Sequence, residues 1–103
     1  MSQNPTLEQL GTGKHIVKFG ASWCGPCKAL EPVFEEIAAE HAASGINFWS
    51  IMIEQDEEGI VDLFAVRSVP LIIFLDEGRV ADMLSREQAT RDKIIEKIHE
   101  LNG

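Results

Sequence analysis

Two kinds of apolar segment alternate along this chain, and their order restricts the fold more than any other feature. Runs rich in β-branched and aromatic residues, typical of strands, occur at 15–19, 46–53, 71–75 and 79–84. Apolar residues spaced three or four positions apart predict helices at 27–43 and 90–101. Shorter helices are expected at 4–10 and just after Asp56. The predicted order is helix, strand, helix, strand, helix, strand, strand, helix.

This order predicts an α/β fold around a mixed sheet. An early strand–helix–strand unit implies a parallel pair joined by a right-handed crossover. The last two strands are joined by the short turn 76–78, so they should be antiparallel. We expect four strands, or five if the N-terminal segment contributes one, with helices on both faces. The nearly continuous apolar segment 46–53 is expected to be a central strand covered on both sides.

Local signals indicate where the helices begin and end. Asn4 is a possible N-cap of the first short helix, with Pro5 just inside it, and Asp56 can cap the next short one. Pro32 lies within the long helix and should kink it, and Gly45 should stop it.

Length and composition indicate one globular domain. The 103 residues leave no room for a second core of ordinary size, and 45% of them are apolar. Residues 1–14 are expected to form a short helix and loop that belong to the same domain as residues 15–103.

The charge balance argues against two classes of partner. Nine basic and 17 acidic residues give a net charge of −8, which disfavours nucleic acid and anionic membranes. No apolar run approaches the roughly 20 residues needed to span a bilayer, and the polar N-terminus does not resemble a secretory signal. We expect a monomer located in a reducing cytoplasm.

The only two cysteines, Cys24 and Cys27, lie where a strand leads into a helix. Free N–H groups and the dipole at a helix N-terminus stabilise a thiolate, the reactive form of cysteine. Cys24 is expected to be the exposed nucleophile, and Cys27, one turn on, the more buried resolving residue. Gly25 would allow close backbone approach and Pro26 suits the first helical turn. Trp23 would supply an apolar wall for recognition.

A Cys-x-x-Cys segment can also serve other purposes. Structural zinc needs two more ligands, and an iron–sulfur cluster would have to be shared between two chains. The pair could also be inert. The three histidines at positions 15, 41 and 99 form no second half-site and are expected at the surface or its boundary. We therefore expect no metal and no cofactor.

The segment 19–28, Phe-Gly-Ala-Ser-Trp-Cys-Gly-Pro-Cys-Lys, closely resembles the thioredoxin family. The resemblance runs from about His15 to the C-terminus, and Pro32 and Gly78 also match family positions. It implies a thioredoxin-like fold, and a cis bond between Val69 and Pro70 that lies against the cysteines. The backbone of Val69 would then pair with an extended substrate strand. An ordinary trans proline is the alternative.

The sequence departs from the family at several positions. Lys18 stands where the family usually has a buried aspartate, and Ile51 replaces the lysine that often partners it. An ammonium group there would lower a thiol pKa, or the side chain could simply extend to solvent. Lys28 is a second possible pKa modulator. Near Ser85 and Arg86 a glycine of the family's partner-contact surface is replaced.

The resemblance implies an enzyme that reduces disulfide-containing protein substrates by reversible dithiol–disulfide exchange and is recycled by a reductase. The sequence leaves two alternatives open. One is a thioredoxin-like binding or accessory subunit whose redox pair is incidental. The other is a disulfide isomerase or a glutaredoxin-like enzyme.

Overall fold

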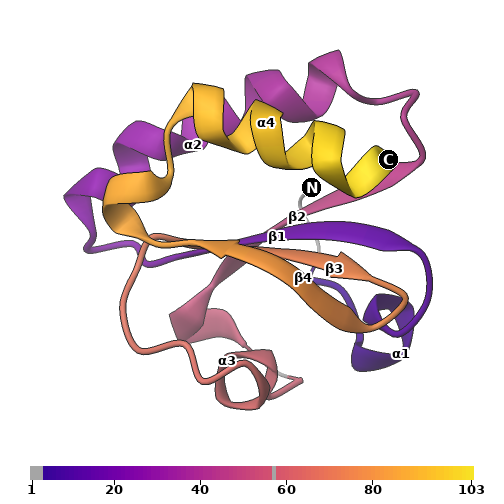
Figure 1. Ribbon diagram of the computed structural model, residues 1–103. Helices are drawn as coiled ribbons and strands as arrows, with labels where there is room; N and C mark the ends of the chain where they lie inside the picture. Colours follow the sequence, from indigo (N-terminus) through magenta and orange to yellow (C-terminus); the bar gives the residue numbers. More distant parts are fainter. Residues whose placement is uncertain (1–3, 57) are drawn as a thin grey trace.

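The computed structural model describes residues 4–56 and 58–103 and contains a mixed sheet with the strand order β2-β1-β3-β4 (Figure 1). The strands are β1 (Lys14–Gly20), β2 (Ile46–Met52), β3 (Leu71–Asp76) and β4 (Arg79–Leu84). β1 pairs with β2 in parallel and with β3 antiparallel, and β3 pairs with β4 antiparallel. The predicted α/β class and mixed sheet are confirmed. Four strands are present in the described residues.

Helices cover both faces of this sheet (Figure 1). The long helices α2 (Gly25–Glu40) and α4 (Arg91–Asn102) lie on one face, and the one-turn helices α1 (Leu7–Leu10) and α3 (Ile60–Leu63) lie on the other. Because side chains alternate across a strand, the sheet divides the core in two. Ile16, Ile72 and Phe74 pack beneath α2 and α4, whereas Val17, Phe19 and Ile73 pack toward α1 and α3.

The prediction that segment 46–53 forms a central strand is wrong. β2 is an edge strand, and the central strand flanked by β2 and β3 is β1, which is buried from His15 to Gly20. The apolar run is misleading because an edge strand can also carry large side chains that pack against a helix. The ring centroids of Phe48 and Phe34 lie 5.9 Å apart in an edge-to-face arrangement.

The expected surface location of His15 is also wrong. Its side chain is only 3% exposed and accepts a hydrogen bond at Nδ1 from Trp49 Nε1, 3.0 Å away. Because an indole N–H can only donate, Nδ1 is the acceptor and Nε2 donates to the Thr12 carbonyl at 2.7 Å. The imidazole thus joins β1, β2 and the loop before β1.

Several helix ends differ from their predicted positions. Thr6, not Asn4, caps α1, through a reciprocal capping box with Gln9, whereas Asn4 donates to the Gln55 carbonyl. α2 ends at Glu40, three residues before the predicted end, and Pro32 lies within it as expected.

Capping of the two later helices follows the sequence more closely. The Asp56 carboxylate accepts hydrogen bonds from Ile60 N and Val61 N at 3.1 and 2.9 Å, although Gly59 occupies the cap position itself. Thr90 caps α4 by accepting from Lys93 N. Short 3-10 turns, η1 (Ile53–Gln55) and η2 (Arg86–Gln88), follow β2 and β4.

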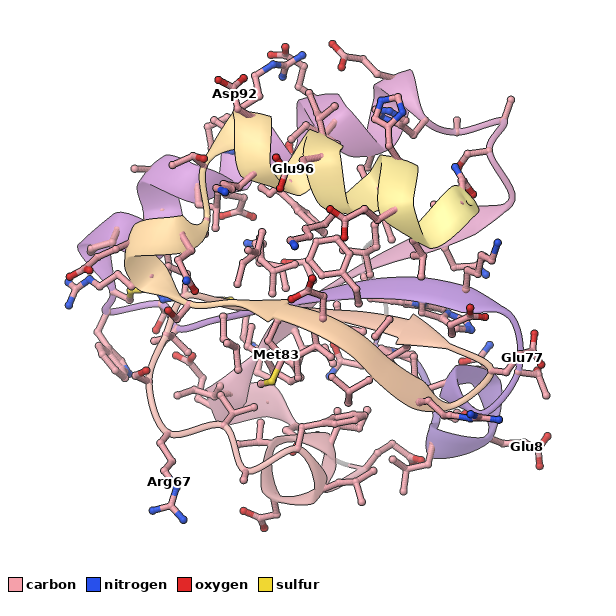
Figure 2. The ribbon with its side chains drawn as sticks, in the orientation of Figure 1. Glu8, Arg67, Glu77, Met83, Asp92 and Glu96 are labelled. Atoms are coloured by element: carbon pink, nitrogen blue, oxygen red, sulfur yellow. A yellow bond between two sulfur atoms is a disulfide. The ribbon has the colours of Figure 1, made fainter. Side chains whose placement is uncertain are left out.

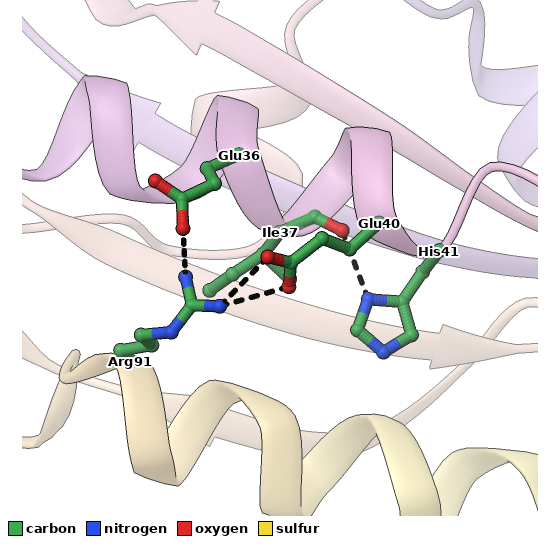
Figure 3. A network of polar contacts seen from close by, with 5 residues as sticks. All are labelled: Glu36, Ile37, Glu40, His41 and Arg91. Carbon is green, nitrogen blue, oxygen red and sulfur yellow. Dashed lines mark hydrogen bonds and ion pairs between the residues drawn. The ribbon is translucent and has the colours of Figure 1, made fainter.

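An ion-pair network joins the two long helices at their exposed side (Figure 3). Arg91 at the start of α4 contacts Glu36 at 2.9 Å and Glu40 at 2.8 Å, both on α2. Hydrogen bonding to Glu40 raises the pKa of Arg91. Because these groups are solvated, they orient α4 on α2 more than they stabilise the fold.

No helix within the described residues is long and apolar enough to cross a bilayer.

Candidate active site

The two cysteines lie at the N-terminus of α2, directly after the loop that follows β1. Cys24 is the N-cap residue, Gly25 and Pro26 form the first two helical positions, and Cys27 is the third. The Cys27 N–H donates to Cys24 Sγ at 3.2 Å, so one of the free helical N–H groups points at this sulfur. The strand-to-helix junction expected from the sequence is therefore present.

Cys24 and Cys27 form a disulfide, with their Cα atoms 5.3 Å apart. Cys24 is only 6% exposed and Cys27 4% exposed. The expectation of an exposed Cys24 is thus wrong for this oxidised form, because Cys24 is packed in a buried cluster that includes Val69. Cys24 Sγ lies 3.9 Å from the Val69 carbonyl oxygen.

The residues around the disulfide differ sharply in exposure. Trp23 is 71% exposed, the largest exposed fraction among the large apolar side chains of the described residues, whereas Val69 and Pro70 are buried. The bond between Val69 and Pro70 is cis, as the family resemblance implied. On the segment leading to it, Arg67 points away from the body of the molecule (Figure 2).

Gly25 does not behave as predicted. A Cβ atom built at this residue would meet nothing within 4 Å, so no close approach inside the described chain requires glycine there. Gly20 is the glycine that does approach the cysteines. A Cβ on it would lie 3.4 Å from Cys27 Cβ and 3.7 Å from Cys27 Sγ. The backbone at the end of β1 therefore packs closely against the Cys27 side chain.

A contact that the sequence did not reveal holds the loop before Cys24. Glu54, in the turn after β2, accepts hydrogen bonds from Ser22 N at 3.1 and 3.3 Å and from the Ser22 hydroxyl. These bonds lower the pKa of Glu54. The two residues are 32 positions apart, and no local sequence pattern predicts their contact. Only the parallel pairing of β1 and β2 places both strand ends side by side.

Lys18, a predicted pKa modulator, is buried. Its side chain is 2% exposed, so the alternative that it extends freely into solvent is wrong. Lys18 lines a hollow of about 360 Å³ together with Gly20, Cys27, Lys28 and Glu31. Burial lowers the pKa of Lys18, and the nearby carboxylates of Glu31 and Glu35 act in the opposite direction.

The second predicted modulator, Lys28, also lines this hollow but is exposed at its rim. The structure therefore brings Trp23, the four residues of the Cys-Gly-Pro-Cys segment and the Val69–Pro70 bond to one end of the sheet, with Lys18 and Lys28 behind Cys27. A paired dithiol in this position can exchange electrons with another disulfide.

A family model described as thioredoxin matches residues 4–100. This chain belongs to the thioredoxin family. It is 41% identical to the thioredoxin of Mycoplasmoides gallisepticum over 69 residues, which make up 67% of this chain. The chain covers 66% of that relative, just under two thirds of its length. Thioredoxin-1 of Caenorhabditis elegans is 33% identical over 85 residues, which cover 81% of this chain and 71% of that protein.

Solved structures agree with this assignment. The crystal structure of the Malassezia sympodialis thioredoxin superposes with a TM-score of 0.80 and 26% identity, covering 93% of this chain and 83% of that one. Fasciola hepatica thioredoxin gives a TM-score of 0.76 at 28% identity. This chain of the thioredoxin family thus has both the family's fold and a closed cysteine pair.

Proposed function

We propose that this thioredoxin-family chain is a thiol–disulfide oxidoreductase that reduces disulfides in protein substrates. The observation that carries the proposal is the Cys24–Cys27 disulfide at the N-terminus of α2, with a helical N–H directed at Cys24 Sγ. The same N–H and the helix dipole favour a thiolate at Cys24 once the pair is reduced.

The reaction proceeds in two exchanges. The Cys24 thiolate attacks a substrate sulfur, forms a mixed disulfide and releases one substrate thiolate, which takes a proton from water. Cys27 then attacks Cys24 Sγ, closes the intramolecular disulfide and releases the second substrate thiolate. Two electrons pass from the cysteine pair to the substrate, and a separate reductase must return two electrons to the pair.

We assign substrate contact to the groups surrounding Cys24. The Val69 carbonyl oxygen lies 3.9 Å from the sulfur, and in this proposal it accepts a hydrogen bond from an extended substrate backbone. Trp23 supplies exposed aromatic surface for apolar side chains. Gly25 and Pro26 are exposed and leave room for the substrate, and the buried Pro70 is joined to Val69 by the cis bond.

The chain's two cysteines both belong to this pair, which fits a monomer working in a reducing cytoplasm. The net charge of −8 argues against partners that present phosphate.

The test is reduction of insulin by dithiothreitol, followed by turbidity. The wild-type protein should accelerate precipitation, and Cys24→Ser should reduce the rate to that of dithiothreitol alone. Cys27→Ser should form the mixed disulfide and fail to release it, so it should accumulate as a covalent adduct. Equal rates for wild type and Cys24→Ser would refute the enzyme and favour an accessory subunit. Activity that requires glutathione as the reductant would favour a glutaredoxin-like enzyme.

A further inference from the structure

Lys18 is a buried cation in the central strand, on the face covered by α2. Its register neighbours, Ser50 on β2 and Ile72 on β3, carry no charge. Its Nζ atom lies 5.8 Å from the ring centroid of Phe34 on α2. A lysine side chain is rarely buried without a reason, because removing an ammonium group from water is unfavourable.

The hollow behind the disulfide connects Lys18 with Cys27. Gly20 is the next residue of β1 on the same face as Lys18, about 7 Å further along the strand, and it lies directly beneath Cys27. Lys18 and Cys27 both line the hollow of about 360 Å³. No side chain at Gly20 separates the ammonium group from the sulfur.

We propose that Lys18 is a positioning residue for the resolving step, and that its ammonium group stabilises the thiolate of Cys27 across this hollow. The inference rests on the proposed oxidoreductase function. A positive charge near a thiol favours ionisation, and the effect is stronger where protein replaces water between the two groups.

In the resolving step one sulfur–sulfur bond forms as another breaks. In the mixed disulfide, the Cys27 thiol loses its proton to water, and the resulting thiolate is held by the Lys18 charge. The thiolate then forms a bond to Cys24 Sγ as the bond between Cys24 and the substrate sulfur breaks. The departing substrate thiolate takes up a proton, and Lys18 keeps its own proton throughout.

The other charges near the hollow come from α2 and from η1, where Glu54 accepts hydrogen bonds from Ser22, a residue that lines the hollow. Glu31 and Glu35 favour the charged form of Lys18, opposing the effect of burial, and both are exposed. Lys28 is also exposed at the rim, where water screens its charge. Among the described residues that line the hollow, Lys18 is thus the one cation that is buried.

The decisive experiment titrates Cys27 in the folded Cys24→Ser protein, where it is the only cysteine. Thiolate absorbance is recorded against pH with Lys18 intact and replaced. We expect Lys18→Met to raise the Cys27 pKa by about one, since a nearby opposite charge lowers a pKa by roughly one or more. Lys18→Arg should restore most of the effect. Lys14→Met removes a cation from the far end of the same strand and should leave the curve unchanged.

A second readout isolates the resolving step in proteins that keep both cysteines. After single-turnover formation of the mixed disulfide, Lys18→Met should slow its resolution about three- to fourfold at neutral pH, because the tenfold smaller thiolate fraction is partly offset by the greater nucleophilicity of the more basic thiolate. The rate of the first attack by Cys24 should stay within about twofold.

Coincident Cys27 titration curves for Lys18 and Lys18→Met would overturn the proposal, even if the protein reduces insulin. Lys18→Gln supplies a second neutral variant if Lys18→Met does not fold. A measurement without substitution at Lys18 is the ¹³C shift of its Cε in Cys24→Ser, which should move when Cys27 ionises. A Lys18 Cε shift that stays constant while Cys27 ionises would also reject the electrostatic interaction between the two residues. Because these titrations need no substrate, their result is separate from that of the insulin assay.

Discussion

The turn between β3 and β4 offers a controlled test of how tightly the N-terminal segment is packed. Gly45 and Gly78 have nearly the same backbone conformation, with φ of +86° and +82°. A Cβ at Gly45 would meet nothing within 4 Å, whereas at Gly78 it would lie 3.2 Å from the Gly11 carbonyl oxygen and 3.4 Å from Gly11 Cα. The two glycines therefore share a conformational requirement and differ in their surroundings.

The two alanine substitutions should differ in magnitude accordingly. Gly45→Ala should reduce the free energy of unfolding by about 1–2 kcal/mol, the penalty for a side chain in the left-handed region. Gly78→Ala adds a backbone clash, and overpacking typically costs a further ~1–3 kcal/mol, so we expect about 2–5 kcal/mol. The clash is hard to relieve, because Glu77 N donates to Gly13 O at 2.9 Å and Gly13 N donates to the Glu77 carboxylate at 3.0 Å.

Urea unfolding of both oxidised variants, with unchanged m-values, measures the difference directly. Insulin reduction by the folded variants should be near wild type, since this turn contributes no residue to the proposed site. Equal losses of stability for Gly45→Ala and Gly78→Ala would refute the packing explanation and leave only the backbone conformation.

Two further predictions concern charged groups. Hydrogen bonds from Ser22 lower the pKa of Glu54, so they should stabilise the fold above the ordinary pKa of 4.5 and lose this effect as pH falls through the lower pKa of the folded state. The difference in free energy of unfolding between wild type and Glu54→Gln should therefore shrink in acid. A difference that does not change with pH would contradict this. Lys97 hydrogen-bonds Asp82 at 2.8 Å, which lowers the pKa of Asp82 and raises that of Lys97. This ion pair should stabilise the folded state between about pH 3.8, the ordinary pKa of Asp82, and about pH 10.5, the ordinary pKa of Lys97. Its contribution should weaken in more acidic and in more alkaline solution. Asp82→Asn should therefore reduce the free energy of unfolding most in that pH range, and less in high salt. A reduction that does not depend on pH would reject the ion pair.

The overall fold was accessible from the sequence because its local signals agree with one another. The hairpin at 76–78 shows this most clearly. Glu77 and Gly78 both have positive φ, the conformation that two-residue hairpin turns require, and β4 matches its predicted bounds of 79–84. The chemistry of Cys24 and Cys27 was accessible for the same reason, since their spacing and their place at a helix start are properties of a single short segment.

Where prediction failed, the missing information was non-local. An apolar run does not reveal whether a strand has one neighbour or two, so β2 was wrongly placed at the centre of the sheet. The sequence predicts a boundary position for His15, because it does not show that Trp49 on the neighbouring strand donates a hydrogen bond to the buried imidazole. Similarly, no spacing rule connects Ser22 with Glu54.

Local sequence is enough to predict the order of the strands and helices, the hairpin, and a pair of thiols at a helix N-terminus, because each depends on the conformational preferences of neighbouring residues. Long-range packing settles which strand is central, what covers Cys24, and that Lys18 lies in the hollow behind Cys27. Those features arise where segments distant in the chain pack together, and the free energy that places them comes from shared burial and not from local conformation.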